Sequence, residues 1–185
     1  MTGDERLIKS YEELIEREAP FFNSLEDARK YVVLNSLKGG TCPACVQTVK
    51  IYPRKFNNMM ALSLIWLARV SKEGSLWIHV PTQAPRRIIK ASCYSKLQYW
   101  NLVRYQPNEN SKHKKTSGVW SVTGRGVRVA RGLKQISTIA YVVDNFVLGH
   151  SDEMVFIQQA LKETFSFDQL WNDPIPIVYA TKEEK

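Results

Sequence analysis

The sequence of 185 residues contains no run of about 18 apolar residues, which is the length that a membrane-spanning helix requires. Its first twenty residues also lack the apolar stretch of a secretory signal peptide and carry more acidic than basic side chains. From these two absences we expect a cytoplasmic protein without a membrane contact. The composition, 44% hydrophobic and 24% charged, is that of an ordinary globular chain rather than a disordered one.

Cysteine and histidine are scarce, with three residues of each. In a reducing compartment we expect thiols or metal ligands rather than disulfides. Cys42 and Cys45 have the spacing of half a zinc site, but a structural zinc site normally needs four ligands, and no second pair of this kind exists. Cys93 and His79 are the remaining candidates to complete it. We predict instead two buried or partly buried thiols at a turn, Cys93 in the core, and no bound metal or cofactor.

Motifs of catalysis are missing as well. The sequence has no phosphate-binding glycine-rich loop, no Gly-x-Ser-x-Gly motif and no helical His-Glu pair with a third ligand. Between residues 38 and 134 the only carboxylates are Glu73 and Glu109, so this stretch has almost no general base. Cys93 with His79 would be a nucleophile and a base, but a single cysteine on the apolar side of a helix usually packs in the core. We predict that the protein is not an enzyme.

The charges are distributed in blocks along the chain. Residues 1–37 contain five lysines and arginines against eight acidic residues, and residues 135–185 contain three against eight. Residues 38–134 contain eighteen against two, within a chain whose net charge is +8. A surface of mixed sign provides solubility without self-repulsion, so such a basic segment indicates an acidic partner. The alternative is that the blocks interleave into a neutral surface after folding.

Hydrophobic periodicity predicts three helices in the first seventy residues. The first covers residues 4–18, and the second is capped by Asn23 or Ser24 and ends before Gly39. The stretch from residue 55 to residue 70 is apolar on most sides, which predicts a helix at the centre of the fold. A short strand over residues 76–80 follows.

A further strong helix is predicted to begin near Ser92. If Leu97 lies at the centre of its buried face, Trp100 lies within about 60° of that centre, by the geometry of the α-helix. Asn101 should end the helix, because asparagine tolerates the left-handed backbone conformation. The residues left on the opposite face and the flanks can bond to bases or phosphates: Ser92, Ser95, Lys96, Gln98 and Tyr99.

Two alternating segments, residues 102–106 and 119–123, predict a pair of strands. The polar loop between them carries three lysines: Lys112, Lys114 and Lys115. Thr123 can cap a short helix that ends at Arg131. A helix, a second helix that ends in a tight turn, and a hairpin with a basic loop together predict a winged helix-turn-helix.

We therefore predict an α+β fold with a winged helix-turn-helix core, an N-terminal helical extension, and a C-terminal β-hairpin plus helix. The hairpin turn is expected at Asp144-Asn145 and the last helix over residues 153–164. The predicted segments are a helical extension (1–40), a winged-helix domain (41–132), a hairpin-helix annex (133–173) and a flexible tail (174–185).

An ordered series of motifs resembles a known family. The segments are CPACVQTVKIYPRKFNNMMALSLIWL, WIHVP, YSKLQYWNLV, SGVWSVTGRGVRVARG, AYVVDNFVLGHSDE and IQQALKETFSFDQLW. They resemble proteins of unassigned function encoded by tailed bacteriophages and prophages, over about two thirds of the chain. The family usually has glycine where this chain has Asn101. The resemblance implies a viral origin and a winged helix with a small appended hairpin and helix, and it implies no established activity.

Duplex DNA is the partner that these features favour. The second helix of such a fold lies in the major groove, and the hairpin loop reaches the backbone or the minor groove. The predicted nucleic-acid-binding residues are Arg86, Arg87 and Lys90 for phosphates, Ser92, Ser95, Lys96, Gln98 and Tyr99 for base edges, and Lys112, Lys114 and Lys115 in the loop. Such proteins commonly pair, so a homodimer is an open alternative. The competing hypothesis is a phage-encoded inhibitor or modulator that binds a host protein in the bacterial cytoplasm.

Overall fold

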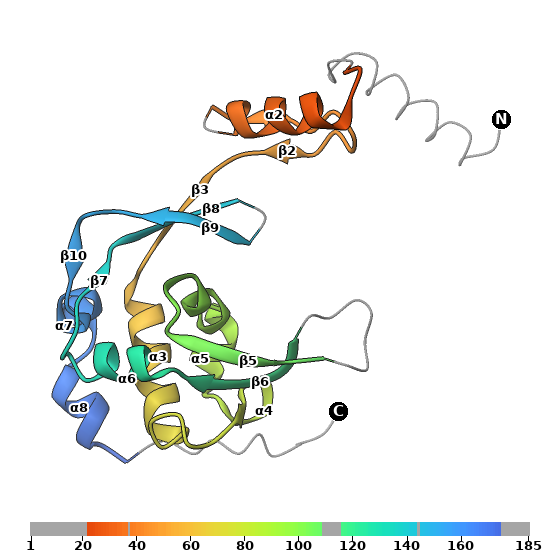
Figure 1. Cartoon of the computed structure of the whole chain (residues 1–185). Helices are drawn as coiled ribbons and strands as arrows, with labels where there is room; N and C mark the ends of the chain where they lie inside the picture. Colours follow the sequence, from red (N-terminus) through yellow and green to blue (C-terminus); the bar gives the residue numbers. More distant parts are fainter. Residues whose placement is uncertain (1–21, 37, 109–115, 144, 175–185) are drawn as a thin grey trace. The chain divides into compact units, whose positions relative to one another are not determined.

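The computed structural model describes residues 22–36, 38–108, 116–143 and 145–174. It has an α+β fold, which confirms the predicted class at that level. The chain divides into two compact units (Figure 1). Among the described residues, unit 1 contains 22–53 and 141–148, and unit 2 contains 54–140 and 149–174. No helix of the described ranges is long and apolar enough to cross a membrane.

Three predictions fall outside the described residues. They concern the helix over residues 4–18, the three lysines of the loop (Lys112, Lys114 and Lys115), and the tail beyond Pro174.

Unit 2 contains most of the secondary structure. In chain order its elements are α3 (Asn58–Val70), β4 (Ile78–His79), α4 (Val80–Gln83), α5 (Arg86–Ala91), the 3-10 helix η1 (Tyr94–Trp100), β5 (Val103–Pro107), β6 (Thr116–Val122), α6 (Gly124–Ala130), β7 (Ile136–Ser137), β10 (Met154–Val155), α7 (Ile157–Leu161), the 3-10 helix η2 (Lys162–Thr164) and α8 (Phe167–Asn172).

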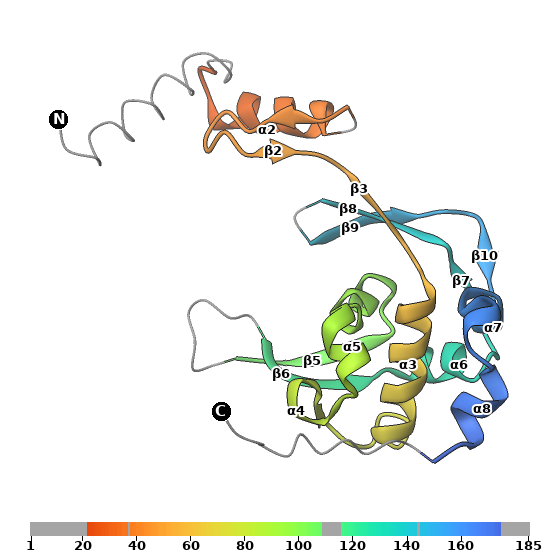
Figure 2. The same ribbon diagram turned by 180° about the vertical axis from the view of Figure 1, so that it is seen from behind.

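The helix α3 lies in the middle of unit 2, and α5, η1, β6, α6, α7 and α8 pack around it (Figures 1 and 2). Asn57 caps its first turn, because its side-chain oxygen accepts a hydrogen bond of 3.0 Å from the backbone N–H of Met60. Its buried residues are Met60, Ala61, Ser63, Leu64, Ile65, Trp66, Leu67 and Ala68. The predicted central helix is therefore confirmed.

A three-stranded antiparallel sheet has the strand order β4-β6-β5, so β6, the last of these three strands along the chain, lies between the other two. Ile78 of β4 pairs with Trp120 of β6, and Val103 of β5 pairs with Val122. These four side chains are buried. These apolar side chains thus lie on the side of the sheet that faces the core.

The helix predicted to begin near Ser92 differs from expectation in its start and its type. Ser92 ends α5 with a left-handed backbone, at a φ of 47°, and η1 begins two residues later as a 3-10 helix. Asn101 ends η1 at a φ of 56°, as predicted. The structure therefore has a tight turn on each side of η1.

The short helix predicted after Thr123 is confirmed. The Thr123 hydroxyl accepts from the backbone N–H of Gly126 at 3.0 Å and donates to the carbonyl of Asn101 at 2.8 Å. The Thr123 side chain therefore caps α6 and also holds the turn that follows η1.

The C-terminal part of unit 2 differs from the predicted helix over residues 153–164. Met154 and Val155 form β10, which pairs antiparallel with β7, and α7 begins only at Ile157. The indole N–H of Trp100 donates to the Ser137 carbonyl at 2.9 Å, so η1 is tied to β7. The indole N–H of Trp171 donates to the Ala130 carbonyl at 3.1 Å and ties α8 to α6.

Unit 1 contains α2 (Leu25–Asn35), β1 (Gly40–Thr41) and β2 (Thr48–Val49). The Ser24 hydroxyl caps α2 by accepting from the backbone N–H of Asp27 at 3.1 Å, as predicted, but the helix ends at Asn35 rather than near Gly39. The strands β3 (Tyr52–Lys55), β8 (Ile139–Val143) and β9 (Phe146–His150) form a sheet in the order β3-β8-β9, and the boundary between the units falls within all three strands.

The glycines of α6 provide a test of this packing. A Cβ atom at Gly126 would lie 2.1 Å from the Leu102 carbonyl oxygen, whereas a Cβ atom at Gly124 would meet nothing within 4 Å. Gly126→Ala should therefore lower the free energy of unfolding by about 1–3 kcal/mol through overpacking. Gly124→Ala should leave it unchanged or raise it by about 0.4–1 kcal/mol. Urea unfolding of both variants measures the difference, and equal effects would contradict the packing of α6 against Leu102.

Candidate nucleic-acid interface

The helix α5 carries three of the predicted phosphate-binding cations. Arg86, Arg87 and Lys90 are all exposed, while Ile88 is buried and faces inward. Arg86 and Lys90 are four residues apart, so they lie on one side of the helix. The sequence therefore brings two of the three cations together on a single exposed stripe.

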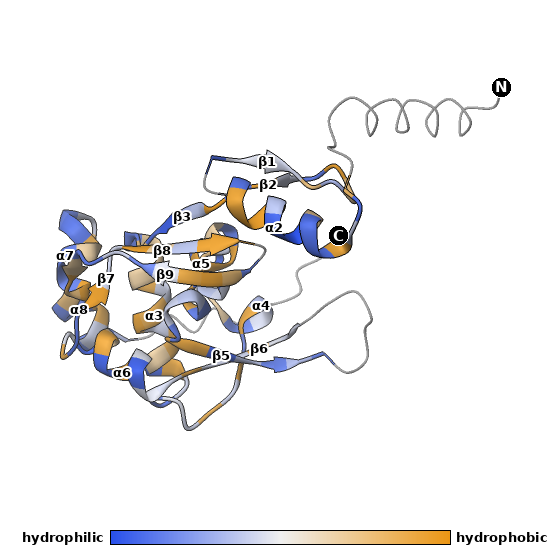
Figure 3. Ribbon diagram, turned by 45° about the horizontal axis from the view of Figure 1, so that its top comes forward, coloured by the Kyte–Doolittle hydropathy of each residue, from blue (hydrophilic) through white to orange (hydrophobic). Residues whose placement is uncertain are grey.

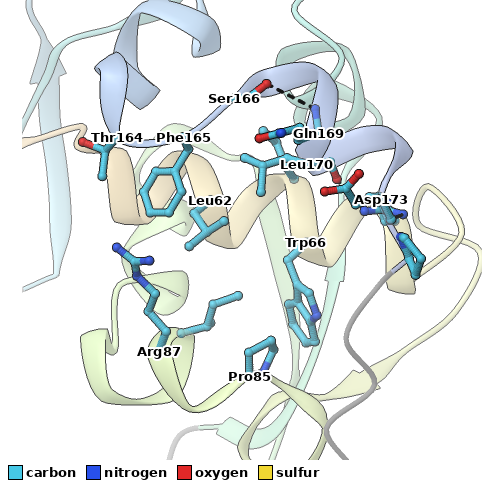
Figure 4. A pocket seen from close by; sticks show the side chains of 14 residues that line it. Leu62, Trp66, Pro85, Arg87, Thr164, Phe165, Ser166, Gln169, Leu170 and Asp173 are labelled. Carbon is cyan, nitrogen blue, oxygen red and sulfur yellow. Dashed lines mark hydrogen bonds between the residues drawn. The ribbon is translucent and has the colours of Figure 1, made fainter.

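Arg87 points toward Phe165 instead. Its guanidinium carbon lies 4.4 Å from the centroid of the Phe165 ring, and both side chains line a pocket of about 500 Å³ between α3, α5 and α8 (Figure 4). Leu62, Ile65 and Trp66 of α3 form the apolar wall of this pocket. The stacking contact with Phe165 is one that the sequence did not indicate, because the two residues lie far apart in the chain.

The reading face predicted on η1 is smaller in the structure. Ser92 is exposed, and Ser95, Lys96 and Gln98 are half-buried. Tyr99 is only 9% exposed, so the prediction that it lies on the exposed face is wrong. The type of the helix and a contact to its backbone both bear on the position of Tyr99, and the sequence showed neither.

The helix type turns the Tyr99 side chain toward the buried face. A 3-10 helix turns by roughly 120° per residue rather than roughly 100°, which moves Tyr99 by about 40° relative to Leu97. A tertiary contact also holds the backbone at this position, since the ring Nε2 of His150 lies 2.9 Å from the Tyr99 carbonyl oxygen. Tyr99 is therefore held by neighbouring structure and not available to a base edge.

Arg104 is a cation that the sequence analysis did not select. It lies on β5, and its guanidinium carbon is 4.9 Å from the centroid of the Trp77 ring, which is 40% exposed. One of its Nη atoms also donates to the Gly74 carbonyl at 3.2 Å. The sequence feature that could have identified Arg104 was its position in an alternating segment just before the loop with three lysines.

The cysteines lie in two different environments. Cys93 is buried and its thiol donates to the Ala91 carbonyl at 3.1 Å, which confirms its predicted place in the core. Cys42 is half-buried and Cys45 is exposed, both in the turn between β1 and β2. A hydrogen bond from the backbone N–H of Ala44 lowers the pKa of the Cys42 thiol, with further hydrogen bonds from Cys45, against the opposing effect of burial.

No family model, no curated protein and no solved structure matches the chain. Function is therefore inferred from the arrangement of its own side chains.

The two neighbouring arginines of α5 give a matched test of the Phe165 contact. Arg87→Gln removes a cation that stacks on an aromatic ring, so it should lower the free energy of unfolding by about 0.5–1 kcal/mol. Arg86→Gln removes an exposed charge without such a ring contact among the described residues and should change stability by less than about 0.5 kcal/mol. Thermal unfolding of both variants decides this; an Arg86 effect as large as that of Arg87 would rule out a specific role for the stack.

Proposed function

We propose that unit 2 contains a winged helix-turn-helix and that the protein binds duplex DNA through it. The observation that carries the proposal is the order of elements from α3 to β6, together with the place of β6 between β4 and β5. In helix-turn-helix proteins the second helix lies in the major groove, and here that helix would be η1, which follows α5 after the tight turn at Ser92.

The charge distribution supports DNA as the partner. Arg86 and Lys90 lie exposed on α5, the half-buried Lys96 follows on η1, and the surrounding block of eighteen cations has two carboxylates. Cations that neutralise phosphates release condensed counterions, and this term supplies most of the non-specific affinity for DNA. The proposed winged helix thus combines a suitable topology with a suitable charge.

The short η1 indicates how the binding energy is divided between contacts to bases and contacts to phosphates. Ser92 lies outside η1, and its hydroxyl donates to the Ile89 carbonyl at 3.1 Å. After the burial of Tyr99, the side chains of η1 left to contact bases are therefore Ser95, Lys96 and Gln98. Glutamine can bond an adenine edge with two hydrogen bonds, but three side chains offer few such contacts. We therefore infer binding that depends mainly on phosphate contacts and is only weakly selective for sequence. In this proposal the protein is a regulatory DNA-binding protein of a tailed phage or prophage, acting in the bacterial cytoplasm.

The salt dependence of DNA binding tests the proposal. The logarithm of the binding constant should fall linearly with the logarithm of the salt concentration, by about 0.9 per neutralised phosphate. Lys96→Ala should reduce the slope by about 1 and weaken binding to unrelated duplexes alike. Replacing Lys112, Lys114 and Lys115 together by alanine should reduce the slope by up to about 3.

Lys134→Ala is the matched control, because Lys134 is exposed and follows α6, which lies on the other side of α3 from α5 (Figures 1 and 2). It should leave the slope unchanged. Fluorescence anisotropy with labelled duplexes measures the binding constant and its dependence on the salt concentration. The absence of binding even in dilute salt would refute the DNA proposal.

One observation favours the alternative function, the binding of a host protein by a phage-encoded modulator. Phe146 is 76% exposed and Leu148 is 59% exposed, both on β9, an edge strand of the β3-β8-β9 sheet (Figure 3). Large apolar side chains exposed together on a sheet edge are typical of protein-binding surfaces. This second proposal would take precedence if the chain failed to bind DNA at low salt.

A further inference from the structure

The pocket between α3, α5 and α8 has the size and the lining of a site for a small molecule. Its volume of about 500 Å³ lies within the range of roughly 300–1,000 Å³ that is usual for ligand pockets. All of its lining residues belong to unit 2, so one compact unit forms the whole site. Figure 4 shows Leu62 and Trp66 entering this space from α3, Arg87 from α5 and Leu170 from α8. Apolar walls with a few polar groups are typical of ligand pockets.

Several polar groups of the lining are already used by the protein itself. The Arg69 guanidinium donates to the backbone carbonyls of Leu170 and Asp173. The Ser166 hydroxyl accepts a hydrogen bond of 3.4 Å from the backbone N–H of Gln169, which caps α8. These hydrogen bonds hold α8 against the other helices, and they build the wall of the pocket rather than offer groups to a ligand.

The indole N–H of Trp66 is a donor without a partner. Trp66 lines the pocket and is only 7% exposed, and within the described residues its N–H donates no hydrogen bond. Buried donors of this kind are rare, because an unpaired N–H loses its hydrogen bonds to water and gains none in return. In Figure 4 the ring nitrogen is on the side of the indole toward Asp173. An acceptor atom of a bound molecule would satisfy this N–H.

The charges of the lining differ between its two ends. The Arg87 guanidinium lies against the Phe165 ring, and within the described ranges it forms no ion pair. The carboxylate of Asp173 lies on the opposite side of the pocket (Figure 4). An acidic group of a ligand is therefore attracted to the Arg87 end and repelled from the Asp173 end. The acceptor that meets the Trp66 N–H, beside Asp173, should accordingly be neutral.

We propose that this pocket binds a small apolar molecule that has a carboxylate at one end and a neutral oxygen acceptor within its apolar part. The carboxylate accepts from the Arg87 guanidinium, and the neutral oxygen accepts from the Trp66 N–H. The apolar part displaces water from Leu62, Ile65 and Leu170, which provides the main driving force. The proposal does not depend on DNA binding, because the site and its test need only this chain.

Three matched compounds separate the two polar contacts. 4-Benzoylbenzoate has the carboxylate and a ketone oxygen between two rings. 4-Benzylbenzoate keeps the carboxylate and replaces the ketone by a methylene group, and 4-benzoylbenzamide keeps the ketone and loses the charge. Calorimetric titration of the full chain gives the dissociation constants. Nitrogen-15 NMR of the same protein follows the indole N–H peaks of its five tryptophans, once the peak of Trp66 is assigned.

4-Benzoylbenzoate should bind with a dissociation constant on the order of 1 mM or below. It should shift the indole peak of Trp66 more than the other four. 4-Benzylbenzoate should bind about fivefold more weakly, because it leaves the N–H unpaired. 4-Benzoylbenzamide should also bind about fivefold more weakly, since the ion pair with the exposed Arg87 contributes only modestly.

Two variants and one control assign these effects to residues. Arg87→Gln should weaken 4-benzoylbenzoate about fivefold and remove the preference for the acid over the amide. Arg86→Gln is the control, because Arg86 is an exposed neighbour on α5 that does not line the pocket, and it should change neither quantity. Trp66→Phe should bind the ketone and the methylene compound equally well. If Trp66→Phe does not fold, the comparison of these two acids on the parent chain still tests the N–H contact.

Three results would overturn the proposal. Equal affinities for the acid and the amide would show that the pocket does not recognise the charge. Equal affinities for the ketone and the methylene compound, with no shift of the Trp66 peak, would show that the indole N–H makes no contact with the ligand. The absence of binding by all three compounds, or shifts confined to other tryptophans, would rule out the pocket as the binding site.

Discussion

The burial of α3 is the constraint on which the rest of unit 2 depends. Leu64, Ile65 and Leu67 are each 1% exposed or less, and each contributes about 1.5–3 kcal/mol by leaving water. Ser63 is also buried, but its hydroxyl donates to the Met59 carbonyl at 2.7 Å, so its polar group is paired. A helix that is apolar on most sides must be covered on most sides, and for this reason α5, η1, β6, α6, α7 and α8 all pack against it.

This packing also determines the proposed DNA surface. The inner face of α5 contributes Ile88 to the core, and as a consequence Arg86 and Lys90 face outward. The turn at Ser92 and the indole of Trp100, bonded to Ser137, then fix the position of η1 beside α5. The exposed cations are thus held by a rigid support rather than by a loop, which lowers the entropy that would be lost on binding.

Local signals in the sequence predicted local structure well. The prediction named Asn23 or Ser24 as one helix cap, Thr123 as another and Asn101 as a left-handed helix end. The structure has Ser24, Thr123 and Asn101 in these roles, because each depends only on a side chain and the backbone next to it. The exposure of Tyr99 and the helical start at residue 153 were wrong. Neither follows from local periodicity, because Tyr99 is turned inward by the 3-10 geometry of η1 and β10 forms by pairing with the distant strand β7.

The candidate sites show the same difference between local features, which the sequence predicted, and features that depend on the folded structure, which it did not. The sequence indicated that Arg86, Arg87 and Lys90 would be exposed on one short helix, but it did not indicate that Arg87 stacks on Phe165. It also provided the spacing of Cys42 and Cys45, and from the missing second pair it predicted thiols without a metal. The donors around the Cys42 sulfur arise from backbone geometry, which spacing alone does not reveal.

The central claim is that duplex DNA binds the exposed side of α5 and η1, and its location on the protein can be measured directly. Hydrogen–deuterium exchange of the full chain, with and without a mixed-sequence duplex at low salt, compares the protection of every backbone amide. We predict slower exchange across residues 86–98 and no change in α7 or α8. Protection confined to the β8–β9 hairpin, or no protection at saturating duplex, would contradict the claim.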